Sequence, residues 1–254
     1  QRQMCIRDRV QSVLQVLQQY APVELACDWD NVGLLVDAGR PVSRIATALD
    51  ITPAVVAEAA QNGCELIVAH HPVIFHPFKR IEAGDVPALL LQNGISAICM
   101  HTNLDAAPGG VNDTLAGLLG MTETEVFAEG CGRIGRLETP TTAEALARRC
   151  ADLLGSHPQY VEADRPVARL AEVSGAGGSE LAAAVALGAD CLVTGEAAHH
   201  IALEARRLGV GLVVAGHWAT EHPIAAVLAG KLAAALPGVE TMACQADTDP
   251  FAYL

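Results

Sequence analysis

The apolar positions of the chain fall into two patterns, helical spacing and short unbroken runs. Residues 10–20 carry apolar side chains at the spacing of an amphipathic helix, which Ala21-Pro22 ends. Thr52, followed by Pro53, is a typical helix start, and Asn62-Gly63 is a typical end. Four apolar runs predict buried strands: 32–36, 45–49, 66–69 and 95–100. The alternation of these elements predicts an α/β fold with a parallel sheet.

The second half of the chain repeats the pattern of the first half. Residues 42–50 align with 167–175 at an offset of 125, which places His70-His71 on Gly195-Glu196. Residues 95–105 align with 211–221 at an offset of 116, so His101 and Asp105 match His217 and Glu221. This repetition predicts a duplicated β-α-β-α-β unit, with two half-structures that face each other about a pseudo-twofold axis. Further helices are predicted at 86–92, 111–119, 199–208 and 224–236, and a further strand at 210–215.

The turn-rich segment 121–137 is predicted to contain the crossover between two halves, 10–125 and 126–254. Residues 1–9 have no periodicity and no starting Met, and they are interpreted as a non-native or disordered leader. They are therefore left out of the fold prediction.

Composition narrows the classes of function. The net charge is −13, and the sixteen Lys and Arg form no dense run, which disfavours nucleic acid and anionic membranes as partners. No apolar segment reaches the roughly 18–20 residues of a membrane span. The eight cysteines are scattered singly, which favours a reduced cytoplasmic protein.

Three predicted strands end in histidine, at His70-His71, His101 and His217. The latter two are followed four residues later by Asp105 and Glu221. Because the carboxyl ends of parallel strands gather at one edge, these side chains are predicted to form a metal site. Each motif alone is better explained as a hydrogen-bonded polar strand end. The combination of all three favours the metal.

The number of candidate ligands favours two ions over one. One catalytic zinc takes three protein ligands and a water. Here five side chains are available, His70, His71, Asp105, His217 and Glu221, with His101 as a sixth candidate. Two divalent ions about 3.5–4 Å apart fit such a set better, and they could lower the pKa of a bridging water. Imidazole and carboxylate ligands suit Zn, Fe, Mn, Co or Ni without choosing among them.

Other polar motifs allow two interpretations each. Glu196, at a predicted strand end, is either a proton shuttle or substrate contact, or a structural acid. His199 and His200 are more typical of structural positions, and His76, His157 and His222 of solvent-facing or turn-capping ones. The run 175–179 is glycine-rich and could seat a phosphate, but a plain turn is the favoured interpretation because no P-loop lysine follows.

Taken together, these motifs resemble the NIF-three-like family, whose members include the dinuclear metal-centre protein YbgI and are often called GTP cyclohydrolase I type 2 homologues. The resemblance covers residues 10–254 and rests on five segments: 28–34, 69–75, 101–105, 194–196 and 216–221. It implies two interlocked, pseudo-symmetric α/β half-domains with a dinuclear site between them, and homohexamers. Its metal ligands fall on His70, His71, Asp105, His217 and a bridging Glu221, with His101 beside the ions. The interval 119–167 is too short for the inserted domain that many relatives carry.

Two functions from different classes follow. The leading hypothesis is a dinuclear-metal-dependent hydrolase acting on a small molecule, possibly a nucleotide, with Glu196 or His101 transferring protons. The alternative is a non-catalytic metal-binding scaffold, metallochaperone or regulatory protein, because no unambiguous general base or substrate motif accompanies the ligands.

Overall fold

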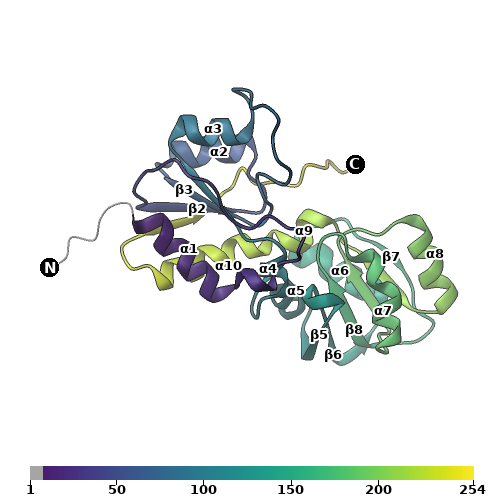
Figure 1. Cartoon of the computed structure of the whole chain (residues 1–254). Coiled ribbons are helices and arrows are strands. Elements are labelled where there is room, and N and C mark those ends of the chain that lie inside the picture. The colour runs from purple at the N-terminus through teal and green to yellow at the C-terminus, as the bar shows by residue number, and fades with distance from the viewer. Residues whose placement is uncertain (1–7) are drawn as a thin grey trace. The chain divides into compact units, whose positions relative to one another are not determined.

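The computed structural model describes residues 8–254 and contains two compact units, each with its own sheet (Figure 1). Residues 8–107 and Ile224–Thr248 form the first unit, and Pro108–Pro223 and Asp249–Leu254 form the second. These units differ from the predicted halves 10–125 and 126–254, because a late segment of the chain returns to the first sheet. Of the predicted leader 1–9, residues 1–7 lie outside the described part, while residues 8 and 9 begin the first helix.

The first unit is a five-stranded sheet with helices on both faces. Its strands lie in the order β1-β4-β3-β2-β11, and only β1 runs antiparallel to its neighbour. The strands are β1 (Gly33–Val36), β2 (Arg44–Ala48), β3 (Leu66–Ala69), β4 (Ser96–Cys99) and β11 (Glu240–Ala243). The helices are α1 (Asp8–Tyr20), α2 (Pro53–Gln61), α3 (Val86–Asn93), α4 (Thr102–Ala106) and α10 (Pro223–Ala235), with a 3₁₀ turn at Val23–Leu25.

Each face of the first sheet is covered by a different pair of helices. Ala46, Ile67 and Ala97 share a buried cluster with Val55 of α2 and Leu90 of α3. On the other face, Thr47 donates a hydrogen bond to the Ala225 carbonyl of α10, at 2.7 Å. Helices α1 and α10 lie together on that face (Figure 1). A sheet covered on both faces explains why β2, β3 and β4 are continuous apolar runs.

The second unit is a six-stranded sheet in the order β5-β6-β8-β9-β10-β7. Its strands are β5 (Met121–Phe127), β6 (Gly132–Thr141), β7 (Gln159–Val161), β8 (Val167–Val173), β9 (Cys191–Thr194) and β10 (Gly211–Val214). Its helices are α5 (Val111–Leu118), α6 (Ala143–Leu154), α7 (Leu181–Ala186), α8 (His199–Leu208) and α9 (His217–Glu221), with 3₁₀ turns at Ala128–Gly130 and Gly177–Glu180. Helices α5 and α6 share one buried cluster with the sheet, and α7 and α8 share another. Both units therefore have the α/β architecture that the apolar pattern predicts.

The segment 121–137 was predicted to be turn-rich, and that prediction is wrong in its secondary structure. It forms most of an antiparallel hairpin, in which Met121 of β5 pairs with Leu137 of β6. The exposed face of β5 is polar, so the segment lacks the unbroken apolar run that marks the central strands. Within the described residues, no helix is both long and apolar enough to cross a membrane.

The predicted repeat is visible in the strand register. Strands β2, β3 and β4 pair in parallel with Leu66 opposite Ser96, and β8, β9 and β10 pair in parallel with Cys191 opposite Gly211. The first offset is therefore 125, as predicted. The second offset is 115 within the strands and becomes 116 only at His217, because the second unit has one additional residue between strand and histidine. That residue is Gly216, whose φ of +95° is accessible to glycine at low cost.

Candidate metal centre

The first unit presents its histidine pair where β3 ends. His70 is fully buried, and its Nδ1 lies 2.9 Å from the carbonyl oxygen of Met100. His71 is half-buried, and its Nδ1 lies 2.8 Å from Oδ1 of Asp50, which follows the end of β2. The two neighbouring strands of β3 therefore supply the groups that orient both rings.

His101 lies just before α4 and completes a histidine cluster with His70 and His71. Ligand-type atoms of the three rings all lie within 4.8 Å of one another. The Nδ1 of His101 is 2.9 Å from Oδ1 of Asp30, whose other oxygen accepts the backbone N–H of Thr102 at 3.0 Å. Burial alone raises the pKa of Asp30, but hydrogen bonds from His101 and Thr102 outweigh it and lower this pKa well below its usual range. Asp30 is therefore an anionic acceptor at neutral pH.

These contacts determine which ring nitrogen of each histidine is available to a metal. A carbonyl oxygen only accepts, so His70 must carry its proton on Nδ1, and neutral imidazole then keeps its lone pair on Nε2. The carboxylates of Asp50 and Asp30 impose the same tautomer on His71 and His101. Metal-binding histidines commonly have this arrangement, in which the second nitrogen donates to a carboxylate or carbonyl.

Asp105 adds a carboxylate to the first unit. It lies in the short helix α4 and is largely buried, and its Oδ1 is 3.6 Å from Nε2 of His70. Two donors bound tetrahedrally to one ion at about 2.1 Å lie about 3.4 Å apart. The separation of His70 and Asp105 fits such a pair of ligands. The first unit thus brings together four of the sequence-predicted residues: His70, His71, His101 and Asp105.

The second unit presents a histidine and two acids where β9 and β10 end. His217 begins α9 and Glu221 ends it, and His217 Nε2 is 3.0 Å from Glu221 Oε2. On the other side of the ring, His217 Nδ1 is 3.0 Å from Oε1 of Glu196. Two donors at 90° on one ion would be about 3.0 Å apart. The second unit therefore also holds a histidine oriented by a carboxylate, with an adjacent acid.

A glycine makes the approach of Glu221 possible. Gly175, with φ +58°, follows β8, and a Cβ built on it would lie 2.1 Å from Glu221 Oε1 and 3.1 Å from His217 Nε2. The Gly175 N–H donates to Thr220 Oγ1 at 3.1 Å, which ties this turn to α9. The backbone at 175 is therefore packed directly against the acid–histidine pair.

Thr220 does not cap the long helix α10 but lies within the short helix α9 that precedes it. The helical turn α9 starts earlier, after Gly216, and the Thr220 hydroxyl donates to the backbone carbonyls of Gly216 and His217. Glu221 is consequently the last residue of α9 and is not in the first turn of α10.

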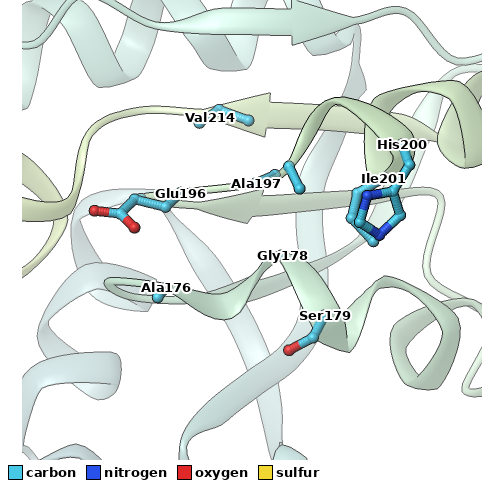
Figure 2. Close-up of a pocket in the computed structure, with 10 residues that line it drawn as sticks. Ala176, Gly178, Ser179, Glu196, Ala197, His200, Ile201 and Val214 are labelled. Atoms are coloured by element: carbon cyan, nitrogen blue, oxygen red, sulfur yellow. The ribbon is translucent and has the colours of Figure 1, made fainter.

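Glu196 also lines a pocket of about 610 Å³ within the second unit. Figure 2 shows Glu196 on one side of this pocket, with His200 and Ile201 on the other and Ser179 along a third wall. The side chain of Glu196 is 57% exposed, so it can meet a ligand while it holds His217. The volume lies within the range of small-molecule sites.

The glycine-rich run 175–179 is a turn, as favoured from the sequence. The N–H of Gly177 donates to Thr194 Oγ1, and the N–H of Gly178 donates to the Glu196 carbonyl, both at 3.0 Å. A Cβ on either glycine would come within 2.8 Å of a neighbouring residue. These glycines serve close packing, and the two amides are already used, so the run does not provide them to a phosphate.

The remaining histidines are outside both clusters. His199 and His200 are exposed at the start of α8. His76 contacts Phe75, and His157 is stacked on Tyr253 with ring centroids 4.3 Å apart. His222 is half-buried and stacked on Trp218 at 4.0 Å, a packing role that its sequence context did not reveal.

Sequence reasoning missed the groups that orient the histidines. Asp30 and Asp50 are the main ones. It also missed Gly175, whose backbone packs against Glu221. Asp50 did carry a signal, since it is an acid immediately after a predicted strand. Asp30 lies 71 residues from its partner His101, and nothing in its local sequence identifies that partner.

Comparisons with known proteins agree with the fold and the motifs. The family model described as Duf34/NIF3 (NGG1p interacting factor 3) matches residues 9–250. A Clostridium acetobutylicum protein named GTP cyclohydrolase 1 type 2 homolog is 30% identical over 96% of this chain and 98% of its own length. Two crystal structures are also similar. One is a Staphylococcus aureus hypothetical protein, with a TM-score of 0.89, 28% identity and coverage of 97% of this chain and 99% of that one. The other is a Bacillus cereus protein related to NIF3, with a TM-score of 0.88, 25% identity and the same coverage.

The similarity spans nearly the whole length of this chain and of these relatives. The chain belongs to the Duf34/NIF3 family.

Proposed function

We propose that the protein is a hydrolase of small molecules that depends on two divalent metal ions, with candidate ligands in each of the two units. The observation that carries the proposal is the uniform orientation of four histidines. His70, His71, His101 and His217 each engage a carbonyl or carboxylate through Nδ1. Four histidines with purely structural roles would have no need to use the same ring nitrogen, Nδ1, for the protein acceptor, whereas metal-binding histidines commonly do so.

The donor set fits divalent transition metals. His70, His71 and Asp105 would be the ligands from the first unit, and His217 and Glu221 those from the second, with His101 beside them. Neutral imidazole and carboxylate together suit Zn, Fe, Mn, Co or Ni. When bound, such ions supply Lewis acidity and lower the pKa of a water molecule.

The chain's own residues supply orientation and proton transfer. Asp50, Asp30 and Glu196 hold the imidazole rings in one tautomer, and this keeps the ligand geometry in place before substrate arrives. Glu196 has a second face on the pocket, where its carboxylate can accept a proton from a bound molecule. His101 is the other candidate for proton transfer, because it lies against His70 and His71.

The pocket sets the size of the substrate. Its walls combine backbone and small side chains with the polar groups of Ser179, Glu196 and His200. A volume of about 610 Å³ admits a molecule as large as a nucleotide and excludes a folded protein chain. The relatives named GTP cyclohydrolase 1 type 2 homolog make a nucleotide the first substrate class to examine.

The test measures metal content and turnover in the same preparations. Purified protein loaded separately with Zn, Mn, Fe, Co and Ni would be assayed against nucleotides, phosphoesters, cyclic amides and peptides. We expect two ions per chain by elemental analysis and turnover of at least one substrate class. His71→Ala in the first unit and His217→Ala in the second should each lower the metal content and abolish turnover.

His157→Ala is the matched control, since His157 lies outside both clusters and stacks on Tyr253. It should keep both metal and activity. Turnover that persists in a folded His217→Ala protein would refute the role of His217 in the hydrolase. Tight binding of two ions without turnover on any panel would instead favour a metal-holding scaffold or metallochaperone.

A further inference from the structure

Two large aromatic side chains stand exposed beside the histidine cluster of the first unit. Trp29 is 62% exposed and Phe75 is 43% exposed, although aromatics make up only 4% of the chain. Their ring centroids lie 6.0 Å apart. Trp29 and Phe75 lie 6.1 and 6.5 Å from the ring of His101. We call Trp29 and Phe75 the aromatic shelf.

The shelf is built on backbone that the site itself holds in place. Asp30, next to Trp29, binds His101 and Thr102. Asn31 donates from Nδ2 to the carbonyl oxygen of Ile74, next to Phe75, at 2.6 Å. The two loops are thus tied to each other and to the candidate metal ligands. The exposure of these rings is therefore a feature of ordered loops.

The two rings next to Trp29 meet its indole at steep angles. Trp29 meets Phe75 at an interplanar angle of 52° and His101 at 75°, so neither ring is stacked face to face on it. An indole that is 62% exposed gains little free energy from burial on folding. Folding alone does not account for such a residue in this position. A planar ligand that stacks on the exposed part of the indole would gain stacking energy.

We propose that the aromatic shelf binds the planar heteroaromatic ring of a small molecule and holds it against Trp29 beside His101. That this molecule is the substrate rests on the proposed function, whereas ring binding does not. A ring stacked on Trp29 would place its substituents next to the imidazole cluster. The substrate class is then a heteroaromatic compound with an electrophilic group on or next to the ring, such as a nucleoside derivative.

The test uses the fluorescence of Trp29 in metal-free protein. The chain has two tryptophans, so Trp218→Phe leaves Trp29 as the only one. Adenosine, nicotinamide and ribose would be titrated into this variant, and binding constants would be measured independently by calorimetry on the otherwise unaltered chain. We expect saturable quenching by adenosine and nicotinamide and none by ribose, which has no aromatic ring.

Substitutions then identify the residues responsible. Trp29→Leu should weaken adenosine binding about tenfold or more, the effect typical of removing one base-stacking ring. Phe75→Leu should weaken it less, because Phe75 forms the side of the shelf. Phe78→Leu is the matched control: Phe78 is 44% exposed on the same loop but, among the described residues, appears in no ring pair with Trp29 or His101. Its dissociation constant should stay within about twofold of wild type.

Two results would overturn the proposal. One is the absence of saturable quenching by any ring compound. The other is a Trp29→Leu variant with unchanged adenosine binding and an altered assembly mass by native mass spectrometry, which would assign the shelf to contacts between copies of the chain. Ring binding without turnover in metal-loaded protein would refute the hydrolase and leave the shelf intact. Turnover without ring binding would refute the aromatic shelf as a binding site and leave the hydrolase intact.

Discussion

The two units are built on the same three-stranded parallel core but differ in what their strands deliver. In both, a fourth strand adds antiparallel beside the third, β1 on β4 and β7 on β10. The second strand of the core ends in His70-His71 in the first unit and in Gly195-Glu196 in the second. The third is followed by a histidine and, four residues later, an acid in both.

The shared features are those that hold the sheet together. Glu65 accepts the backbone N–H groups of Ser43 and Arg44, at 2.9 and 3.0 Å, and thereby joins the starts of β2 and β3. Asp190, at the offset of 125, accepts those of Ala168 and Arg169 at the start of β8, at 3.0 and 2.8 Å. The three-stranded cores of the two units thus share individual hydrogen bonds as well as their strand order.

The differences that concern the candidate site lie at the carboxyl ends of the strands, where ligands are bound in parallel sheets. At these ends the first unit carries three histidines, and each is oriented by a separate acceptor. The second carries one histidine, a glycine-lined approach and the pocket. The first unit thus carries more of the candidate metal ligands, and the second combines a histidine–acid pair with a pocket.

Of the substitutions that test the difference between the two units, Gly175→Ala should have the largest effect on metal affinity. A Cβ at 175 would displace the Glu221 carboxylate, because the two atoms would lie 2.1 Å apart. We expect metal affinity to fall about 100-fold or more, in line with the loss of a ligand or its support. Isothermal titration of metal into the metal-free variant would measure this.

Gly188→Ala is the matched control for that substitution. Gly188 also has a positive φ, +84°, but a Cβ there meets nothing within 4 Å. Both variants should lose about 1–2 kcal/mol of stability from backbone strain. Only Gly175→Ala should lose metal, and equal metal affinity in the two variants would show that the contact between residue 175 and Glu221 does not matter for binding.

Replacing the acids that orient histidines should have the next largest effect. Glu196→Gln and Asp50→Asn each retain size but remove the charge facing Nδ1 of His217 or His71. We expect metal affinity to fall about 10- to 100-fold in each. The two variants should differ in how they act on substrate, because only Glu196 also lines the pocket.

Kinetics would show that separation. Glu196→Gln should lower kcat even when metal is saturating, whereas Asp50→Asn should regain wild-type kcat once enough metal is added. If excess metal restores both equally, Glu196 has only the positioning role. That outcome would remove the functional difference drawn between the two units.

How far the sequence predicts this molecule depends on the range of the interaction involved. The strands β2, β3 and β4 and their counterparts were predicted because burial on both faces makes them apolar throughout. The hairpin of β5 and β6 was missed because its outer residues face solvent and its pairing is antiparallel. The local pattern of apolar residues therefore reveals a strand only when burial makes the residues of that strand apolar.

The candidate site was predicted as a set of residues, without the contacts that orient them. His101 and Asp105 are four residues apart, so their relation is readable from spacing. The contact of Asp30 with His101 spans 71 residues and depends on how a loop folds back over α4. The offset of 116 was one residue too long within the strands, because the extra Gly216 lies after β10. Alignment without a gap hid that insertion.

The smallest expected effect concerns what the two units share. Glu65→Gln and Asp190→Asn should each destabilise the protein by about 1–2 kcal/mol at pH 7, because each replaces a charged acceptor of two backbone N–H groups. Hydrogen exchange should locate the loss in β2 and β3 for the first variant and in β8 and β9 for the second. Glu204→Gln, in an exposed pair with Arg207, should change neither.

The dependence of this effect on pH follows from the two carboxyl groups. Burial raises the pKa of Glu65 and of Asp190, but hydrogen bonds outweigh it and lower both. These come from backbone N–H groups in each case, and also from the Ser43 hydroxyl to Glu65 and the Arg165 guanidinium to Asp190. A lowered pKa in the folded state stabilises the fold above the ordinary carboxyl pKa of about 4, and that stabilisation is lost as pH falls through the folded value. Urea unfolding of metal-free protein should therefore show the gap between wild type and either variant shrinking below about pH 4. A gap that shrinks for one variant only would mean that the two units do not share this anchor energetically, even though they share it in geometry.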